Sequence, residues 1–160
     1  MIHKADLQTW IEQFLAGTDY ELVTLNISAA NDILVEVDRL ADVDVDFCAD
    51  LNRFIVDKLD VTPDADDYSL EVGSVSLTDP FKTKTQFLKN LGHDVEVMAK
   101  GEKGEWRKYK GLLVSVDDES FSVDVEERVA VEGKKRKELC CVTRTWRYDE
   151  PKYVKYDLKF

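Results

Sequence analysis

The sequence has few of the residues that restrict or cross-link a chain: three prolines, seven glycines, two histidines and three cysteines among 160 residues. The cysteines, Cys48, Cys140 and Cys141, are odd in number, two are adjacent, and none has C-x-x-C spacing. This pattern indicates neither a disulfide framework nor a zinc site. We expect Cys48 to be a small buried hydrophobic residue.

Sequence motifs of common enzymes are also missing. The chain has no G-x-S-x-G, P-loop, G-x-G-x-x-G or H-E-x-x-H sequence. Asp42, Asp44, Asp46 and Asp50 alternate as calcium ligands do, but the glycine and closing glutamate of an EF-hand are absent, which favours a solvated helix start. The sequence therefore predicts a protein that acts by binding, with no catalytic residue, metal or cofactor. A divergent enzyme with a scattered site is the weakest hypothesis.

Long apolar runs are absent. No window approaches the roughly 18 apolar residues that span a membrane, and the first residues lack an apolar signal core with a cleavage site. With 44% hydrophobic residues, the chain can bury one good core or two small ones. We expect a soluble cytoplasmic protein that is a monomer and has no membrane partner.

Negative charge is concentrated in the first half of the chain. Residues 1–82 hold 18 Asp and Glu against 5 Lys and Arg, a net charge of −13, whereas residues 83–160 hold 15 acids and 17 bases, a net charge of +2. An acidic face repels phosphate and attracts basic proteins, and a near-neutral half with basic clusters is compatible with RNA. The simpler interpretation is that excess acid keeps the protein soluble.

Residues 1–82 predict an α+β domain in the order helix, hairpin, helix, strand, a sandwich-like unit with both helices on one side of a small sheet. Apolar periodicity and turn residues give the expected elements: a helix over 6–16, strands over 20–28 and 32–38, a helix from Asp44 or Asp46 to 62–64, and a strand over 68–73. Trp10 should be largely buried against the sheet, and Val23, Leu25 and Ile27 should share one strand face.

Residues 83–160 have the composition of an all-β domain. Short runs of β-forming residues alternate with turn residues at 101–104 and 117–120. Five short strands in about seventy residues predict a small closed barrel, because closure removes exposed strand edges.

The two halves meet in the segment YSLEVGSVSLTDPF, residues 68–81. Tyr68, Leu70 and Val72 alternate with polar or small residues, as in a half-buried strand, and the pattern then stops. Thr78–Pro80 favours a turn, because these residues bond to the backbone or lock φ.

The string LEVGSVSLTDPF resembles the domain-junction signature L-E-V-S-S-P-G-L-x-x-P-L of the bacterial ribosome maturation factor RimP family, with departures at Gly73, Val75 and Ser76. VDVDFCADLNR, FLKNLGHDVEV and KGLLVSVDDESFSVDV are similar to further family segments, the last two to its opening barrel strands. The resemblance implies an SH3-like or Sm-like barrel over residues 83–160. The junction residues are Gly73, Ser74, Leu77, Thr78, Asp79 and Pro80.

Two basic groups are candidate ribosome contacts: Lys134, Lys135, Arg136 and Lys137 in one run, and Arg107 and Lys108 in another. The run follows Gly133, where an exposed loop could engage phosphates at low salt or be only a solvated turn. Aromatic residues nearby, Trp106, Tyr109 and Trp146, could stack on bases, but on a strand such residues more often face the core.

The resemblance implies a maturation factor that associates with the immature small ribosomal subunit and promotes its assembly. In members of that family the barrel docks on a ribosomal protein of the decoding region, so the expected partners are a basic ribosomal protein and rRNA. The leading alternative is a general Sm-like RNA-binding module that is not dedicated to ribosome assembly.

Overall fold

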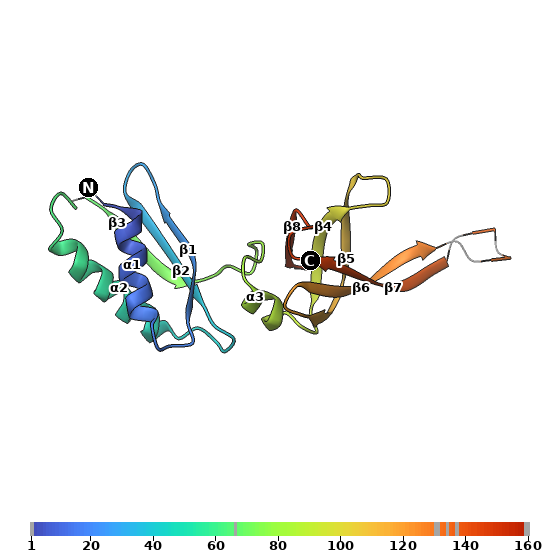
Figure 1. The fold of residues 1–160 in the computed structure, drawn as a ribbon, viewed down its shortest axis with the longest axis horizontal. Helices are drawn as coiled ribbons and strands as arrows, with labels where there is room; N and C mark the ends of the chain where they lie inside the picture. Colours follow the sequence, from blue (N-terminus) through green and yellow to red (C-terminus); the bar gives the residue numbers. More distant parts are fainter. Residues whose placement is uncertain (1, 66, 130–131, 134, 137, 159–160) are drawn as a thin grey trace. The chain divides into compact units, whose positions relative to one another are not determined.

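The computed structural model describes residues 2–65, 67–129, 132–133, 135–136 and 138–158. Contacts within the chain define two compact units, Met1–Ser76 and Leu77–Phe160, here unit 1 and unit 2. The described residues form a mixed α+β fold with three helices and two sheets (Figure 1). A boundary between separately folding domains at residues 82 and 83 stays a prediction.

Unit 1 packs two helices on one face of a three-stranded sheet (Figure 1). Its elements are α1 (Lys4–Leu15), β1 (Glu21–Ile27), β2 (Asp32–Asp38), α2 (Val45–Asp60) and β3 (Ser69–Ser74). The strand order is β1-β2-β3, with β1 antiparallel and β3 parallel to β2. A parallel neighbour needs a crossover, which α2 supplies. The element order is the predicted one.

The core of unit 1 follows a spacing of four residues along each helix. Leu7, Ile11 and Leu15 are the buried residues of α1, and Leu51, Ile55 and Leu59 are those of α2. Trp10 is only partly buried against this core, which corrects the prediction that it is largely buried. The reason is geometric: residues four apart define the centre of the stripe, and Trp10 lies at its rim.

A β-bulge changes which residues of β1 face the core. The pairing of β1 with β2 shifts between Leu22 and Thr24, so Leu22, Leu25 and Ile27 pack against the core. Val23 is the extra residue, and the prediction that it shares a face with Leu25 and Ile27 was wrong. A bulge adds one residue to a strand and so reverses the alternation of faces beyond it.

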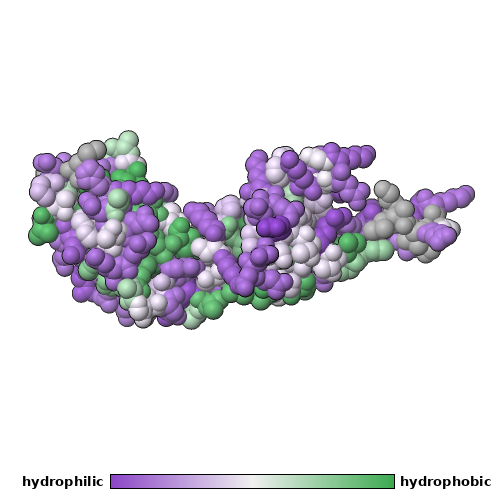
Figure 2. All heavy atoms as spheres, in the orientation of Figure 1, coloured by the Kyte–Doolittle hydropathy of each residue, from purple (hydrophilic) through white to green (hydrophobic). Residues whose placement is uncertain are grey.

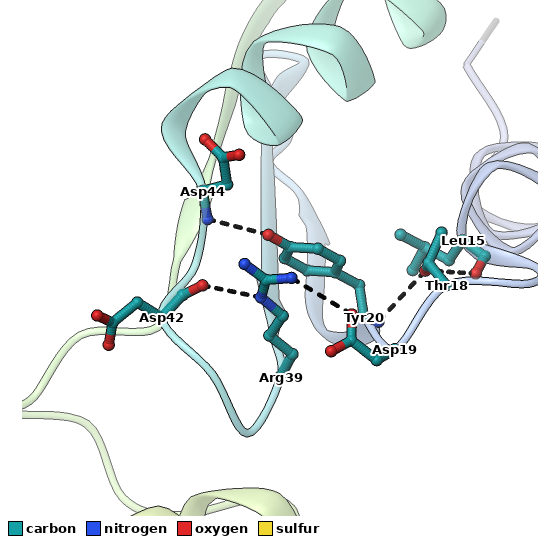
Figure 3. A network of polar contacts seen from close by, with 7 residues as sticks. All are labelled: Leu15, Thr18, Asp19, Tyr20, Arg39, Asp42 and Asp44. Atoms are coloured by element: carbon teal, nitrogen blue, oxygen red, sulfur yellow. Dashed lines mark hydrogen bonds and ion pairs between the residues drawn. The ribbon is translucent and has the colours of Figure 1, made fainter.

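The start of α2 is fixed by Asp44, whose carboxylate accepts a hydrogen bond from the Asp46 amide at 2.9 Å. The hydroxyl of Tyr20 accepts one from the Asp44 amide at 2.9 Å (Figure 3). The Tyr20 ring stacks on Phe47 with centroids 3.7 Å apart, and the Arg39 guanidinium lies 4.5 Å from its centroid. These contacts join the start of β1 to the loop before α2.

Unit 2 is a five-stranded antiparallel sheet with one short helix. Its elements are α3 (Lys84–Lys89), β4 (Asp94–Lys100), β5 (Trp106–Val116), β6 (Ser120–Val129), β7 (Glu138–Arg147) and β8 (Tyr153–Tyr156). The strand order is β7-β6-β5-β4-β8. All five strands contribute to one core, with Val97, Leu113, Phe121, Trp146 and Val154 among its buried residues.

The predicted closed barrel is not found in the described part of unit 2. The outer strands of the sheet are β7 and β8, and no pairing joins them among the described residues. β8 has four residues and pairs only with β4, whereas β7 pairs with β6 along the hairpin that extends beyond the rest of the unit (Figure 1). The sheet therefore encloses its core without a closing ladder.

The helix α3 was missed: its last three residues, 87–89, fall in the segment that was likened to the opening barrel strands, and no element was predicted for residues 84–86. Thr83 accepts from the Gln86 amide, and the Gln86 side chain accepts from the Thr83 amide at 3.1 Å, which is a capping box. The sequence signal was the T-x-x-Q spacing of these two residues.

On the face drawn in Figure 2, hydrophilic residues cover most of each unit and hydrophobic ones show as separate patches. Within the described ranges, none of the helices has the length and apolar character needed to cross a membrane.

Candidate functional site

The basic run falls in the sequence between β6 and β7. Lys135 and Arg136 are exposed there, while Lys134 and Lys137 lie outside the described residues. The described part of the loop is therefore accessible, and its role as a phosphate contact stays a prediction.

The neighbouring bases Arg107 and Lys108 lie on opposite faces of β5. The Arg107 guanidinium lies 5.5 Å from the ring centroid of Tyr109, a core residue that is 3% exposed. Lys108 is opposite Met98 on β4 and faces the other side of the sheet. A pair that looks like one basic cluster in the sequence is thus divided between two surfaces.

The outward face of the sheet formed by β8, β4 and β5 gathers lysines from separate segments. In the register, Lys110 and Lys155 lie on either side of Glu96. Lys100 lies opposite Trp106, and the Lys152 amide donates to the Met98 carbonyl at 2.7 Å. We name this surface the basic sheet face: Lys100, Trp106, Lys108, Lys110, Lys152, Tyr153 and Lys155, with Glu96 at its centre.

Glu96 lies at the centre of the basic sheet face and contacts residues on both sides of it. Its side chain is only 9% exposed. It accepts a hydrogen bond from the Tyr153 hydroxyl at 2.7 Å, and its oxygens lie 3.8 Å from Lys110 Nζ and 3.6 Å from Lys155 Nζ. Burial raises the pKa of Glu96, but this hydrogen bond and the charges of Lys155, Lys108 and Lys110 together lower it. Glu96 is therefore ionised at neutral pH and orients two lysines.

Trp106 is the exposed aromatic residue of this face. It is 49% exposed, with Lys100 Nζ 5.5 Å and Lys152 Nζ 6.0 Å from its ring centroid. Tyr109 and Trp146 belong to the core, in agreement with the interpretation that aromatic residues on these strands face inward. Trp106 is the exception to that interpretation.

The bases on the inner side of the sheet are held by internal contacts. Arg144 donates from Nε and Nη2 to the two carboxylate oxygens of Glu127 at 2.7 and 2.8 Å. Its guanidinium also lies 5.1 Å from the centroid of Tyr109. The Glu127 hydrogen bond is the largest cause that raises the pKa of Arg144. This arginine is already paired within unit 2.

The junction signature residues lie at the end of β3 and in the turn that follows: Gly73 and Ser74, then Leu77, Thr78, Asp79 and Pro80. Leu77 is 66% exposed. The Phe81 amide donates to the Val154 carbonyl at 2.7 Å, so the chain is part of unit 2 by that point. A functional role for the signature stays a prediction.

Two of the acidic residues around α2, Asp44 and Asp50, have structural partners for their carboxylates. Asp44 caps the helix, and the Asp42 carbonyl accepts from Arg39 Nε at 2.8 Å (Figure 3). Asp50 pairs with Arg53 at 2.8 Å. In the described parts of the chain, no three His, Cys, Asp or Glu side chains converge as metal ligands do.

Cys48 is partly buried against the core of unit 1, less deeply than predicted. Burial, and then the charge of Asp44, raises the pKa of its thiol. The thiol therefore stays protonated at neutral pH and is a weak nucleophile.

Most of the basic sheet face was missed from the sequence, which singled out only Lys108 among its lysines. The spacing of Trp106, Lys108 and Lys110 is a period of two and could have indicated one strand face. Lys100, Lys152 and Lys155 come from other segments, and only strand pairing brings them to the same surface.

Comparison with known proteins gives one family. Residues 10–77 match the family model of the RimP N-terminal domain. Two proteins from strains of Porphyromonas gingivalis, both named Ribosome maturation factor RimP, are 33% identical to this chain over 137 residues, which is 86% of this chain and 86% of each relative. The resemblance found in the sequence is confirmed. The chain belongs to the RimP family of ribosome maturation factors.

Proposed function

We propose that this protein associates with the immature small ribosomal subunit and promotes its maturation by binding, without catalysing a covalent reaction. The observation that carries this proposal is the similarity, across 86% of the chain, to proteins named ribosome maturation factor. Two surfaces of opposite charge support it, because a ribosomal subunit offers both anionic rRNA and basic proteins.

The two units are suited to different partners on that subunit. Unit 1, with its acidic excess, favours a basic ribosomal protein, and unit 2 favours rRNA through the basic sheet face and the exposed Lys135 and Arg136. Arg107 lies on the opposite face of β5 from Lys108, so the proposed RNA surface does not include it.

Unit 2 is, in this proposal, an open relative of the SH3-like barrel, which the single core shared by its five strands supports. The protein acts in the cytoplasm, where ribosomes mature, and as a monomer.

Sucrose-gradient sedimentation of a cell lysate tests the proposal. The protein should travel with free small subunits, enriched in immature ones, and be absent from mature ribosomes. A protein found with every RNA-containing fraction would instead be the general RNA-binding module that is the alternative. Deletion of the gene should cause precursor small-subunit rRNA to accumulate, and unchanged rRNA processing would contradict the assembly role.

A further inference from the structure

We propose that the basic sheet face binds single-stranded RNA, with Trp106 stacking on a base and the lysines around it contacting phosphates. This inference rests on the proposed function and deepens it, because it names the chemical partner of one surface. The proposed binding mode includes base stacking, which is not proposed for the basic β6–β7 loop.

The exposed indole is the first reason. Trp106 leaves 49% of its surface in contact with solvent at the start of β5. Tyr109 and Trp146, the aromatic residues on the opposite side of β5 and on β7, are 3% and 8% exposed. A large exposed ring on a sheet surface is the platform on which unpaired bases stack in proteins that bind single strands.

The cations around the ring are the second reason. Lys100 and Lys152 lie 5.5 and 6.0 Å from the Trp106 centroid, close enough to reach the phosphates of a nucleotide stacked there. Lys108 follows on the same face of β5, one strand period from Trp106. A base at Trp106 would therefore have positive charge on both β4 and β5 beside it.

Charge balance on the face is the third reason. The five lysines of this face surround the buried carboxylate of Glu96, and the acidic residues of the surface lie beyond Lys110, at the end away from Trp106: Asp94, Asp124, Glu126 and Asp157. Glu96 neutralises part of the charge of Lys110 and Lys155 and fixes their position. Positive charge is therefore concentrated at the Trp106 end of the face, and lysines already ordered by Glu96 and by the indole lose less conformational entropy when they contact phosphate.

Single-stranded RNA fits this arrangement better than the other polyanions that a cell offers. A duplex keeps its bases stacked on one another, so it cannot use an exposed indole on a sheet surface. An acidic protein segment supplies carboxylates but no base to stack. Only an unpaired strand presents ring faces and phosphates in alternation.

The test uses the full-length protein and a fluorescein-labelled ten-nucleotide oligouridine, with fluorescence anisotropy over a salt series. Affinity should fall as salt rises, with a log–log slope of roughly −2 if three phosphates are contacted. Trp106→Ala should weaken binding on the order of tenfold, and Trp106→Phe should retain most of it. Lys108→Gln should weaken binding and make the slope shallower by about 0.7.

Arg107→Gln is the matched control, since it removes one positive charge next to Lys108 but from the opposite face of β5. It should leave the affinity and the slope unchanged, and thermal melting should show that each variant is folded. Three outcomes would each overturn the proposal. Trp106→Ala could bind as tightly as wild type, or Arg107→Gln could lose as much affinity as Lys108→Gln. Polyglutamate or duplex RNA could also compete as strongly as single-stranded RNA.

Sedimentation separates this inference from the proposed function. If the wild type fails to bind oligouridine but travels with small subunits, the RNA surface is wrong and the maturation role stands. If oligouridine binding is confirmed but the protein does not associate with small subunits, the RNA surface stands and the maturation role fails.

Discussion

Unit 1 and unit 2 distribute charge in different ways. In unit 1, with a net charge of −13 over residues 1–76, two helices cover one face of the sheet, and acidic residues such as Asp50 and Asp57 lie on the exposed side of α2. Unit 2 has a net charge of only +2 over residues 77–160, yet lysines gather on the outward face of three strands.

The difference shows that net charge is a poor guide to what a surface can bind. Two acids of unit 2 are paired away from the basic sheet face: Glu127 with Arg144, and Asp118 with Lys84 beside α3. These acids offset positive charge elsewhere in unit 2, whereas Lys100 and Lys152 gather at the ring of Trp106. Position in the sheet, more than composition, creates the candidate site.

The first way to test the comparison is to break one core and observe the other. Phe121→Ala in unit 2 should cost about 3–5 kcal/mol, and Leu51→Ala in unit 1 about 2–5 kcal/mol, because both side chains are 0% exposed. Urea unfolding followed by fluorescence can assign each loss, since Trp10 reports on unit 1 and Trp106 and Trp146 on unit 2. If the units fold independently, each substitution moves only its own transition; a joint shift would show that they unfold as one.

A second comparison uses two glycines that lie in strands. A Cβ at Gly111 would lie 2.0 Å from the Asp124 carbonyl oxygen, whereas a Cβ at Gly73 would have nothing within 4 Å. Gly111→Ala should therefore destabilise unit 2 by roughly 1–3 kcal/mol through overpacking, and Gly73→Ala should change unit 1 by about 0.5 kcal/mol or less. Thermal melting of the two variants checks this, and equal effects would contradict the close approach of β5 and β6.

Helix caps give a third comparison. Asp44→Ala should cost unit 1 about 1 kcal/mol, because the carboxylate no longer accepts from the Asp46 amide. Thr83→Ala should have an effect of similar size on unit 2, where it removes half of the capping box with Gln86. Asp44→Asn and Thr83→Ser retain an acceptor and serve as controls. Loss of stability in a control as large as in the alanine variant would argue against capping as the cause.

The smallest expected effect is a pH dependence confined to unit 2. The pKa of Glu96 is lowered in the folded protein, so its contribution to stability is present above the unfolded pKa and is lost as pH falls through the folded pKa. Unfolding free energy measured below about pH 5 should therefore decline less steeply in Glu96→Gln than in wild type. Identical pH profiles would show that the lysines and Tyr153 do not stabilise the carboxylate.

Local patterns in the sequence were sufficient for much of unit 1. The apolar face that includes Leu51, Ile55 and Leu59 predicted α2, and its cap was predicted at Asp44 or Asp46, of which the structure has Asp44. The strand over 32–38 was predicted at its observed bounds. Val23 and Trp10 were misplaced, because a bulge and the rotation of a helix against its sheet depend on the partner element and leave no mark in the local pattern.

Unit 2 was predicted less completely, since its form depends on pairing between distant strands. The sequence indicated five strands and the turns at 101–104 and 117–120, but not that β7 and β8 remain at opposite edges of the sheet. Closure depends on whether those two strands meet, and no local property of either strand encodes that.

The sequence by itself determined the family, the two halves of opposite charge and most of the element types, because periodicity, caps and turns are local properties. Only the tertiary structure decided which charged residues share a surface. It placed Lys108 and Arg107 on opposite faces and brought Lys100, Lys110 and Lys155 around Glu96. The physical reason is register: side chains alternate along a strand, so pairing between strands decides which of them meet.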